Sequence, residues 1–187
     1  SYAQLLLSET PPQDPHYSIL KKMERQTFRA AHLVNNLLEF ARPRPRARVR
    51  TDLARVLANA AESVETAFTE RELRLDLEGQ EGSVWVLGDP RELEQIFVNL
   101  LTNARDASPE GGLVSCALRQ KDGFAEVTVA DRGAGLPADA GEKLFQPFFT
   151  TKKSGGTGLG LAISREIARR HGGDIGIRTR EGGGTEA

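Results

Sequence analysis

The sequence has one cysteine and no long hydrophobic run. The single residue Cys116 excludes an internal disulfide, and its place in the apolar run 113–118 predicts a buried packing role. No stretch approaches the roughly 20 apolar residues of a transmembrane helix, and residues 1–9 lack the basic region and cleavage site of a signal peptide. We therefore expect a cytoplasmic chain, either on its own or as the cytosolic part of a membrane-bound protein.

An excess of charge of one sign is also missing, because the formal net charge is -1 over 187 residues. Such a balance gives no general attraction to nucleic acid or to an anionic membrane. The basic segment 42–50, RPRPRARVR, is the one candidate patch, and it lacks the interleaved aromatic residues of a nucleic-acid surface. We expect no nucleic-acid partner. With 39% hydrophobic residues, the chain has enough apolar surface for one sizeable domain plus an appendage.

The first part of the chain is expected to be a partial helical hairpin. Between residues 17 and 41, apolar and small residues recur at alternating spacings of three and four, which is typical of a helix that pairs with another. Residues 1–9 are interpreted as the end of an antiparallel helix, joined through the proline-containing segment 10–15. A single hairpin cannot bury a two-sided stripe, so we predict a homodimer through these helices, as a four-helix bundle.

Prolines in segment 42–50 end the second helix and mark a domain boundary. The predicted organisation is a helical domain at 1–42, a linker at 43–51 and a second domain at 52–187. The expected helices of the second domain are 52–68, 89–107 and 159–171, with Asp52 and Asp89 as N-caps of the first two. The expected strands are 73–77, 84–87, 113–119, 125–130 and 174–179, with a turn at Asp122-Gly123 between the third and the fourth. This order predicts an α+β fold, a two-layer α/β sandwich with a mixed sheet.

Four short motifs in this second domain each have a physical reason to contact a magnesium nucleotide. In the first, Asn99 and Asn103 lie four residues apart, on one face of a helix whose other face is apolar. Mg²⁺ prefers oxygen ligands, and a neutral amide suffices when a triphosphate brings the negative charge. Alternatively, the two residues are asparagines on the surface of a helix.

The second motif, Asp131-Arg-Gly133-Ala-Gly135, follows an apolar strand. A carboxylate at a strand end can accept a hydrogen bond from the exocyclic amine of adenine, and glycines let the backbone approach the flat base. A simple turn is the alternative.

The third motif is aromatic, Phe145-Gln-Pro-Phe148-Phe149-Thr-Thr-Lys152. Aromatic residues at the base of a loop can anchor a mobile lid, and Lys152 or Lys153 can reach a phosphate as a point charge. An ordinary aromatic core patch is the alternative.

The fourth motif, residues 155–161 with the sequence GGTGLGL, leads into a helix. Glycine-rich backbone before a helix N-terminus is an anion site, because unpaired amides and the helix dipole point at the phosphates. The motif lacks GxxxxGK[ST] and does not follow a strand, so it is neither a Walker phosphate loop nor a dinucleotide fingerprint. The absence of DFG and HRD motifs excludes a eukaryotic-type protein kinase.

The order and spacing of the four motifs resemble the N, G1, F and G2 boxes of sensor histidine kinases, within the wider group of ATPases (the GHKL superfamily) that includes gyrase, a heat-shock chaperone and mismatch-repair ATPases. The resemblance covers essentially the whole chain and implies a Bergerat-type ATP-binding fold with helices on one face of the sheet. The sequence Asn103-Ala-Arg-Asp-Ala and the short lid resemble the nitrogen-regulation branch.

The resemblance also implies roles for individual residues. Asn103 would coordinate Mg²⁺, and Asn99 would support the metal and phosphate site, so these two are the candidate catalytic residues. Asp131 would hydrogen-bond adenine, and Thr185, at the end of a last glycine box at 182–185, would support that aspartate. The other residues implied to bind ATP are Gly133, Gly135, Lys152, Gly156, Thr157, Gly158, Leu159, Gly160, Leu161 and Thr185. The chain departs from the family at Asp106, where many members carry a phosphate-binding lysine.

The segment 33–43, which ends NLLEFARP, resembles the second dimerisation helix of histidine kinases. In that family the phosphoacceptor histidine is followed by an acidic residue, a pattern that His16, His32 and His171 all lack. We therefore expect no phosphoacceptor in this chain, and no appreciable autophosphorylation by it. The implied function is transfer of the γ-phosphoryl group of Mg-ATP to a histidine of a dimerisation helix, for relay to the receiver domain of a response regulator.

Two alternatives remain at this point. One is a non-catalytic dimerisation module that responds to nucleotide. The other is an ATPase of the gyrase or chaperone type, in which a glutamate general base precedes the metal asparagine by one helical turn. Asn99 occupies that position and cannot abstract a proton, so we expect slow hydrolysis.

Overall fold

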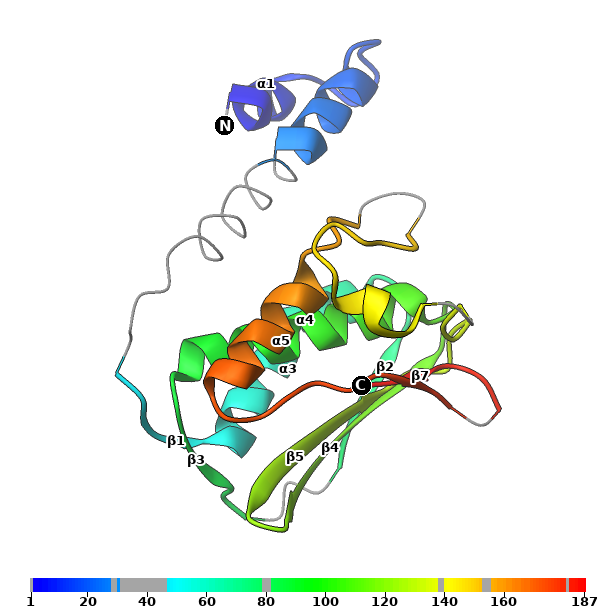
Figure 1. Ribbon diagram of the computed structural model, residues 1–187. Coiled ribbons are helices and arrows are strands. Elements are labelled where there is room, and N and C mark those ends of the chain that lie inside the picture. The colour runs from blue at the N-terminus through cyan, green and yellow to red at the C-terminus, as the bar shows by residue number, and fades with distance from the viewer. Residues whose placement is uncertain are drawn as a thin grey trace. The chain divides into compact units, whose positions relative to one another are not determined.

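The computed structural model describes residues 2–27, 30, 47–78, 82–137, 140–152, 156–180 and 182–187 (Figure 1). The chain divides into two compact units, Ser1–Arg44 with Thr151–Thr157 and Pro45–Thr150 with Gly158–Ala187. In the part of the chain that is described, no helix has both the length and the apolar character needed to cross a membrane. The bounds predicted for the two domains and their linker stay a prediction.

The first unit contains two helical segments. Helix α1 spans Tyr2–Glu9 and has no buried residue, and a second helical segment is described at 17–27 and at residue 30. Both begin where the sequence predicts, and the remainder of the predicted helix to residue 41 lies outside the described residues. Large apolar side chains of both segments are exposed, namely Tyr2, Leu5, Leu6, Ile19 and Met23.

The second unit contains three α-helices, which begin close to their predicted positions. Helix α3 spans Leu53–Thr69 and helix α4 spans Pro90–Ala107. Their N-caps are the predicted aspartates, since the Asp52 carboxylate accepts from the Ala54 amide at 3.1 Å and that of Asp89 from the Arg91 amide at 2.9 Å. A 3₁₀ helix, η1, spans Gly141–Phe145, and helix α5 spans Gly160–Arg170.

The strands form one five-stranded sheet and one two-stranded sheet. The larger sheet has the order β2-β4-β5-β7-β6, with β2 parallel to β4 and the other neighbours antiparallel. Its strands are β2 Arg74–Glu78, β4 Leu113–Lys121, β5 Phe124–Ala130, β6 Arg178–Thr179 and β7 Thr185–Glu186. Helices α3, α4 and α5 lie on one side of this sheet (Figure 1), so the predicted mixed sheet with helices on one face is confirmed.

The hairpin between β4 and β5 turns at Asp122 and Gly123. Their φ angles of 51° and 81° are both positive, as a two-residue type I′ turn requires. This turn fixes the register, in which Lys121 pairs with Phe124 and Cys116 with Val129. The sheet therefore presents one alternating row of side chains to the helices and the other row to solvent.

The core lies between the sheet and the helices. Val114, Cys116 and Leu118 alternate along β4 with relative exposures of 2% or less, and Leu101 of α4 and Ile167 of α5 are equally buried. Burial raises the pKa of the Cys116 thiol to about 12, because the thiolate would lose its hydration. The predicted packing role of this cysteine is confirmed.

Three strands differ from the prediction. Strand β7, Thr185–Glu186, was not predicted, and it pairs antiparallel with β5 and with β6. Strand β1, Val49–Asp52, was not predicted as a strand, and it pairs antiparallel with β3, Trp85–Gly88. The predicted strand 174–179 is wrong over its first four residues, since β6 contains only Arg178 and Thr179. There the Asp174 carboxylate accepts from the Ile175 amide at 2.8 Å and from the Arg165 guanidinium.

Candidate functional site

Asn99 and Asn103 lie one turn apart on α4, and both are half-buried beside the buried face that contains Ile96, Leu100 and Ala104. The side-chain amide nitrogen of Asn99 donates to the carbonyl oxygen of Gly160 at 3.4 Å and to the hydroxyl of Ser164 at 3.2 Å. Because a backbone carbonyl only accepts, the amide atom of Asn99 that bonds Gly160 must be the nitrogen. The first motif is thus tied to the helix that follows the fourth motif.

Ser164 was missed by the sequence analysis. Its side chain is fully buried on α5, where it accepts the hydrogen bond from Asn99. The signal in the sequence was a single polar residue among the apolar residues Ala162, Ile163 and Ile167 of the same helix. A buried hydroxyl at such a position needs a hydrogen-bond partner, but the sequence does not indicate which residue supplies it.

Asp131 is the buried carboxylate of the site, with a relative exposure of 4%. One carboxylate oxygen, Oδ1, accepts from the Gly133 amide at 2.8 Å and from the Thr185 amide at 3.1 Å. The backbone of Asp131 also pairs with Thr185, from N–H to O at 2.9 Å. The contact between Asp131 and Thr185 that the resemblance implied is therefore present, and it is made through the backbone amide of the threonine.

Glycines are required around Asp131 because backbone segments approach closely there. A Cβ at Gly133 would lie 2.2 Å from the carbonyl oxygen of Ala107, the last residue of α4. A Cβ at Gly184, whose φ is +92°, would lie 2.1 Å from the carbonyl oxygen of Asp131. Gly135 also has a positive φ, +75°, and it lies beside Gly184 and Thr179. These contacts exclude any side chain at Gly133 and Gly184.

These contacts place three of the four motifs around α4. Asn99 contacts α5 at Gly160 and Ser164, and Gly133 lies against the carbonyl of Ala107, eight residues further along the same helix. Asn103 is four residues from Asn99 and four from Ala107, so the three residues share one face of the helix. It therefore lies between the beginning of α5 and the Asp131 loop.

The aromatic motif and the glycine motif are joined by their backbones. The Phe148 amide donates to the Gly158 carbonyl at 2.9 Å. A Cβ at Gly158 would lie 2.3 Å from the carbonyl carbon of Phe148, and both residues have positive φ, 67° and 69°. A positive φ at a phenylalanine is a strained conformation of the kind that clusters at ligand sites. Leu159 then buries its side chain, and Leu161 lies in the first turn of α5.

Three of the predicted ATP-binding residues fall in the other compact unit. Lys152, Gly156 and Thr157 belong to the segment Thr151–Thr157, so their assignment to phosphates stays a prediction. Gly155 and Lys153 lie outside the described residues. At the position of the family lysine, the carboxylate of Asp106 accepts from the Arg105 guanidinium at 2.6 and 2.9 Å.

His171 has a structural place, as the sequence predicted. One ring nitrogen, Nδ1, lies 2.8 Å from the carbonyl oxygen of Ile167, and the other accepts from the Asp89 amide at 3.1 Å. These partners require the neutral tautomer with its proton on Nδ1. His16 is exposed and pairs with Asp14, and His32 lies outside the described residues.

No group of three or more His, Cys, Asp or Glu side chains within the described ranges could hold a metal ion. A magnesium ion that arrives with a nucleotide needs fewer protein ligands, because it keeps waters and phosphates.

The chain is similar in sequence to known proteins. The family described as histidine kinase-, DNA gyrase B-, and HSP90-like ATPase matches residues 88–187. The chain is 32% identical over 183 residues to the sensor histidine kinase ZraS of Klebsiella oxytoca, covering 97% of this chain and 39% of that protein. It is 35% identical over 201 residues to the sensor kinase CckA of Brucella abortus, covering 98% of this chain and 21% of that protein.

Solved structures give the same fold. The full-length kinase ShkA in complex with AMPPNP is similar with a TM-score of 0.80 and 27% identity, over 97% of this chain and 39% of that chain. The catalytic domain of the histidine kinase ThkA is similar with a TM-score of 0.69 and 29% identity, over 75% of this chain and 93% of that chain. The chain thus spans about two fifths of ZraS and about one fifth of CckA.

Proposed function

Since this chain belongs to the histidine kinase-, DNA gyrase B- and HSP90-like ATPase family and contains a catalytic ATP-binding domain of the sensor histidine kinase type, we propose that it supplies the nucleotide half of a phosphoryl transfer. The γ-phosphoryl group of Mg-ATP passes to a histidine of a dimerisation helix, and from there to the receiver domain of a response regulator. The observation that carries the proposal is the buried carboxylate of Asp131, held in place by two backbone amides.

Asp131 recognises adenine in this proposal. The hydrogen bonds from Gly133 and Thr185 both fall on Oδ1, so the carboxylate has one defined rotamer and its Oδ2 accepts from the exocyclic amine of adenine. Gly133 and Gly135 let the base approach the backbone. A base with a carbonyl oxygen in place of that amine would bind less tightly, because its oxygen and Oδ2 of Asp131 are both hydrogen-bond acceptors.

Asn103 is the magnesium ligand that we propose, with Asn99 supporting the site. The donor set fits an ion carried in by the nucleotide, since one neutral amide oxygen suffices beside phosphate and water oxygens. Magnesium, when bound, neutralises charge on the transferring phosphoryl group. Asn99 lies one helical turn before Asn103 on α4, and its amide nitrogen bonds the beginning of α5.

The beginning of α5 provides the phosphate contacts. The residues Gly158, Leu159, Gly160 and Leu161 precede or form the first turn of this eleven-residue helix, where the helix dipole favours an anion. The phosphate contacts that the resemblance implies for Lys152, Gly156 and Thr157 stay a prediction. Positioning and charge neutralisation of this kind supply most of the rate enhancement in phosphoryl transfer.

Homodimerisation through the N-terminal helices is also part of the proposal. Leu5 and Leu6 of α1 and Ile19 and Met23 of the next helical segment are each more than half exposed. A helix with no buried residue gains most of its stability from packing against another surface. A second copy of the chain offers such a surface, as a four-helix bundle.

Two other functions predict different chemistry for the same fold. An ATPase of the gyrase type requires a general base near the attacking water, and the amide of Asn99 cannot accept a proton. A non-catalytic module would bind nucleotide without any transfer. The assignment to the nitrogen-regulation branch stays a prediction.

The three functions are separated by one experiment with γ-labelled Mg-ATP. The chain is incubated alone and with a dimerisation domain of a related kinase that carries its histidine, and protein label and free phosphate are measured. We expect acid-labile label on the added domain, none on this chain and slow release of phosphate. Fast phosphate release without label would establish an ATPase, and binding with neither product would establish a module.

A further inference from the structure

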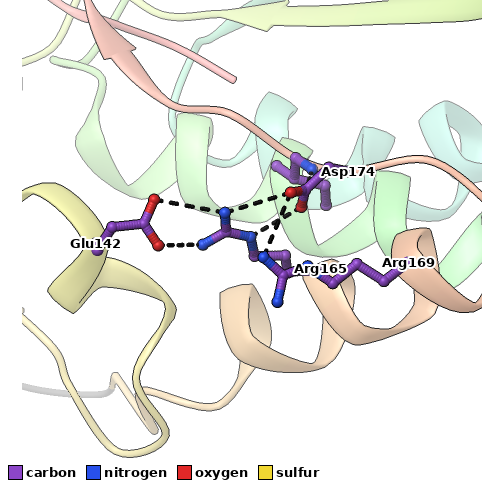
Figure 2. A network of polar contacts seen from close by, with 5 residues as sticks. Glu142, Arg165, Arg169 and Asp174 are labelled. Atoms are coloured by element: carbon purple, nitrogen blue, oxygen red, sulfur yellow. Dashed lines mark hydrogen bonds and ion pairs between the residues drawn. The ribbon is translucent and has the colours of Figure 1, made fainter.

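Arg165 of α5 is enclosed by three side chains from two other segments. Its Nε donates to Oδ1 of Asp174 at 2.8 Å, and its Nη2 lies 3.3 Å from Oδ2 of the same carboxylate. On the other edge, Nη1 and Nη2 donate to the two carboxylate oxygens of Glu142. The face of the guanidinium lies 4.2 Å from the ring centroid of Phe145. Figure 2 shows Arg165 between the two carboxylates.

Arg165 is much less exposed than its two carboxylate partners. The Arg165 side chain is 15% exposed, whereas Glu142 is 80% and Asp174 is 49% exposed. Both carboxylates thus reach from solvent to a guanidinium that is largely covered. The hydrogen bonds with Asp174 and Glu142 raise the pKa of Arg165, and the bond with Arg165 holds the pKa of Asp174 well below its usual range.

The two carboxylates come from different parts of the fold. Asp174 lies just after the end of α5, so its bonds to Arg165 and to Arg169 at 3.4 Å stay within one helix and its exit. Glu142 and Phe145 belong to η1, which directly precedes the aromatic motif. Only the Glu142 and Phe145 contacts join α5 to η1 through Arg165.

The segment from η1 to Phe149, residues 141–149, is named here the lid base. It is attached to the glycine motif at its far end, where the Phe148 amide donates to the Gly158 carbonyl. Arg165 attaches it at its near end. The two attachments fix the lid base at both ends, beside the helix whose first turn we assign to the phosphates.

We propose that Arg165 is a positioning residue for nucleotide binding, which holds the lid base against α5 through Glu142 and Phe145. The inference rests on the proposed function and deepens it, because the residues of the lid base lead directly into the segment 151–157. The guanidinium makes two forked contacts and one stacked contact at once, which a lysine ammonium cannot reproduce. Positioning of the lid base therefore depends on the planar shape of the guanidinium as well as on its charge.

The test compares variants that remove contacts from different edges of the Arg165 guanidinium. The Kd of Mg-AMPPNP, the melting temperature and the hydrogen exchange of the Phe148 amide are measured for the wild type, Glu142→Ala, Arg165→Lys and Asp174→Asn. The matched control is Glu166→Ala, an exposed position next to Arg165 on α5. Asp174→Asn removes the charge on the edge that does not lead to the lid base.

We expect Glu142→Ala and Arg165→Lys to raise the Kd roughly 5- to 20-fold, in the lower range of coupling between two sites, and to speed exchange at Phe148. Asp174→Asn lowers the melting temperature and changes the Kd less than about twofold, and Glu166→Ala changes neither. An unchanged Kd in Glu142→Ala, or an equal rise in Asp174→Asn, overturns the inference while the wild type still binds. Failure of the wild type to bind overturns the proposed function itself.

Discussion

The side-chain amide of Asn99 donates to the buried hydroxyl of Ser164 at 3.2 Å, across the interface between α4 and α5. This bond and the one to the Gly160 carbonyl determine which way the Asn99 amide faces. The orientation of a proposed catalytic side chain is therefore set by a helix that lies 61 residues or more away in the chain.

Replacement of Ser164 by Ala tests this relationship. The substitution removes one acceptor and leaves a buried amide hydrogen of Asn99 unpaired, so we expect a loss of about 1–3 kcal/mol in unfolding free energy. We also expect weaker binding of Mg-AMPPNP, since the Asn99 amide is then held by Gly160 alone. Urea denaturation and calorimetric titration measure the two effects. Ser63→Ala is the matched control, because the Ser63 hydroxyl bonds its own helix at an exposed site; an equal loss there would contradict the account.

Gly133 and Gly176 form a matched pair of glycines. A Cβ at Gly133 would lie 2.2 Å from the Ala107 carbonyl oxygen, whereas a Cβ at Gly176 meets nothing within 4 Å. We expect Gly133→Ala to cost about 1–3 kcal/mol of stability and to weaken nucleotide binding, because the Asp131 loop must move away from α4. Gly176→Ala should stay within about 0.5 kcal/mol of the wild type. Thermal denaturation of both variants decides, and similar melting temperatures would show that the loop does not pack on α4.

His171 is predicted to stabilise the fold without taking part in phosphoryl transfer. Its ring joins the end of α5 to the beginning of α4 by accepting from the Asp89 amide. His171→Phe removes the two ring nitrogens that contact the Asp89 amide and the Ile167 carbonyl, at a cost of about 1–3 kcal/mol. Denaturant unfolding should show this loss, while nucleotide affinity per folded molecule stays close to that of the wild type. A phosphoryl label on the wild-type chain that His171→Phe abolishes would contradict the structural role.

The ion pair of Arg165 and Asp174 predicts how stability depends on pH. Arg165 lowers the pKa of Asp174 in the folded state, so the folded chain binds this proton less readily than the unfolded chain. Its contribution is complete above the ordinary carboxyl pKa of about 3.9 and is lost as the pH falls from there toward the lowered value. Melting temperatures of wild type and Asp174→Asn should differ at neutral pH and converge in acid. Because both groups touch solvent, salt should reduce the difference. A difference that grows in acid would contradict this.

Much of the fold could be predicted because local signals agree with the tertiary structure. Asp52 and Asp89 marked helix starts through capping, and Asp122-Gly123 marked the hairpin through its two positive φ angles. Strand β1 could not be predicted, since Val49 to Asp52 form a strand only by pairing with β3, more than thirty residues later. The apolar content of residues 174–177 predicted a strand, but in the structure the Asp174 carboxylate accepts a hydrogen bond from Arg165.

In the candidate site too, residues in short motifs could be predicted and contacts between distant residues could not. Asn99, Asn103, Asp131 and the glycines stand in short motifs whose order alone indicated a nucleotide site. Ser164 and the Glu142–Arg165 contact were not found, because each joins residues that only the folded chain brings together. Contacts of this kind require the packing of α4, α5 and η1, and no spacing in the sequence specifies it.

The measurement that tests the central claim most directly is the affinity of the wild type and Asp131→Asn for ATP and inosine triphosphate, each with Mg²⁺. Asparagine keeps the oxygen that accepts from Gly133 and Thr185, and it replaces Oδ2 with a donor. We predict that the variant folds normally, loses about 10- to 100-fold in ATP affinity, the equivalent of one hydrogen bond to a charged acceptor, and prefers inosine triphosphate, whose carbonyl accepts from the new amide. A folded variant that binds both nucleotides as the wild type does would contradict the assignment of Asp131 to adenine, and with it the proposed site.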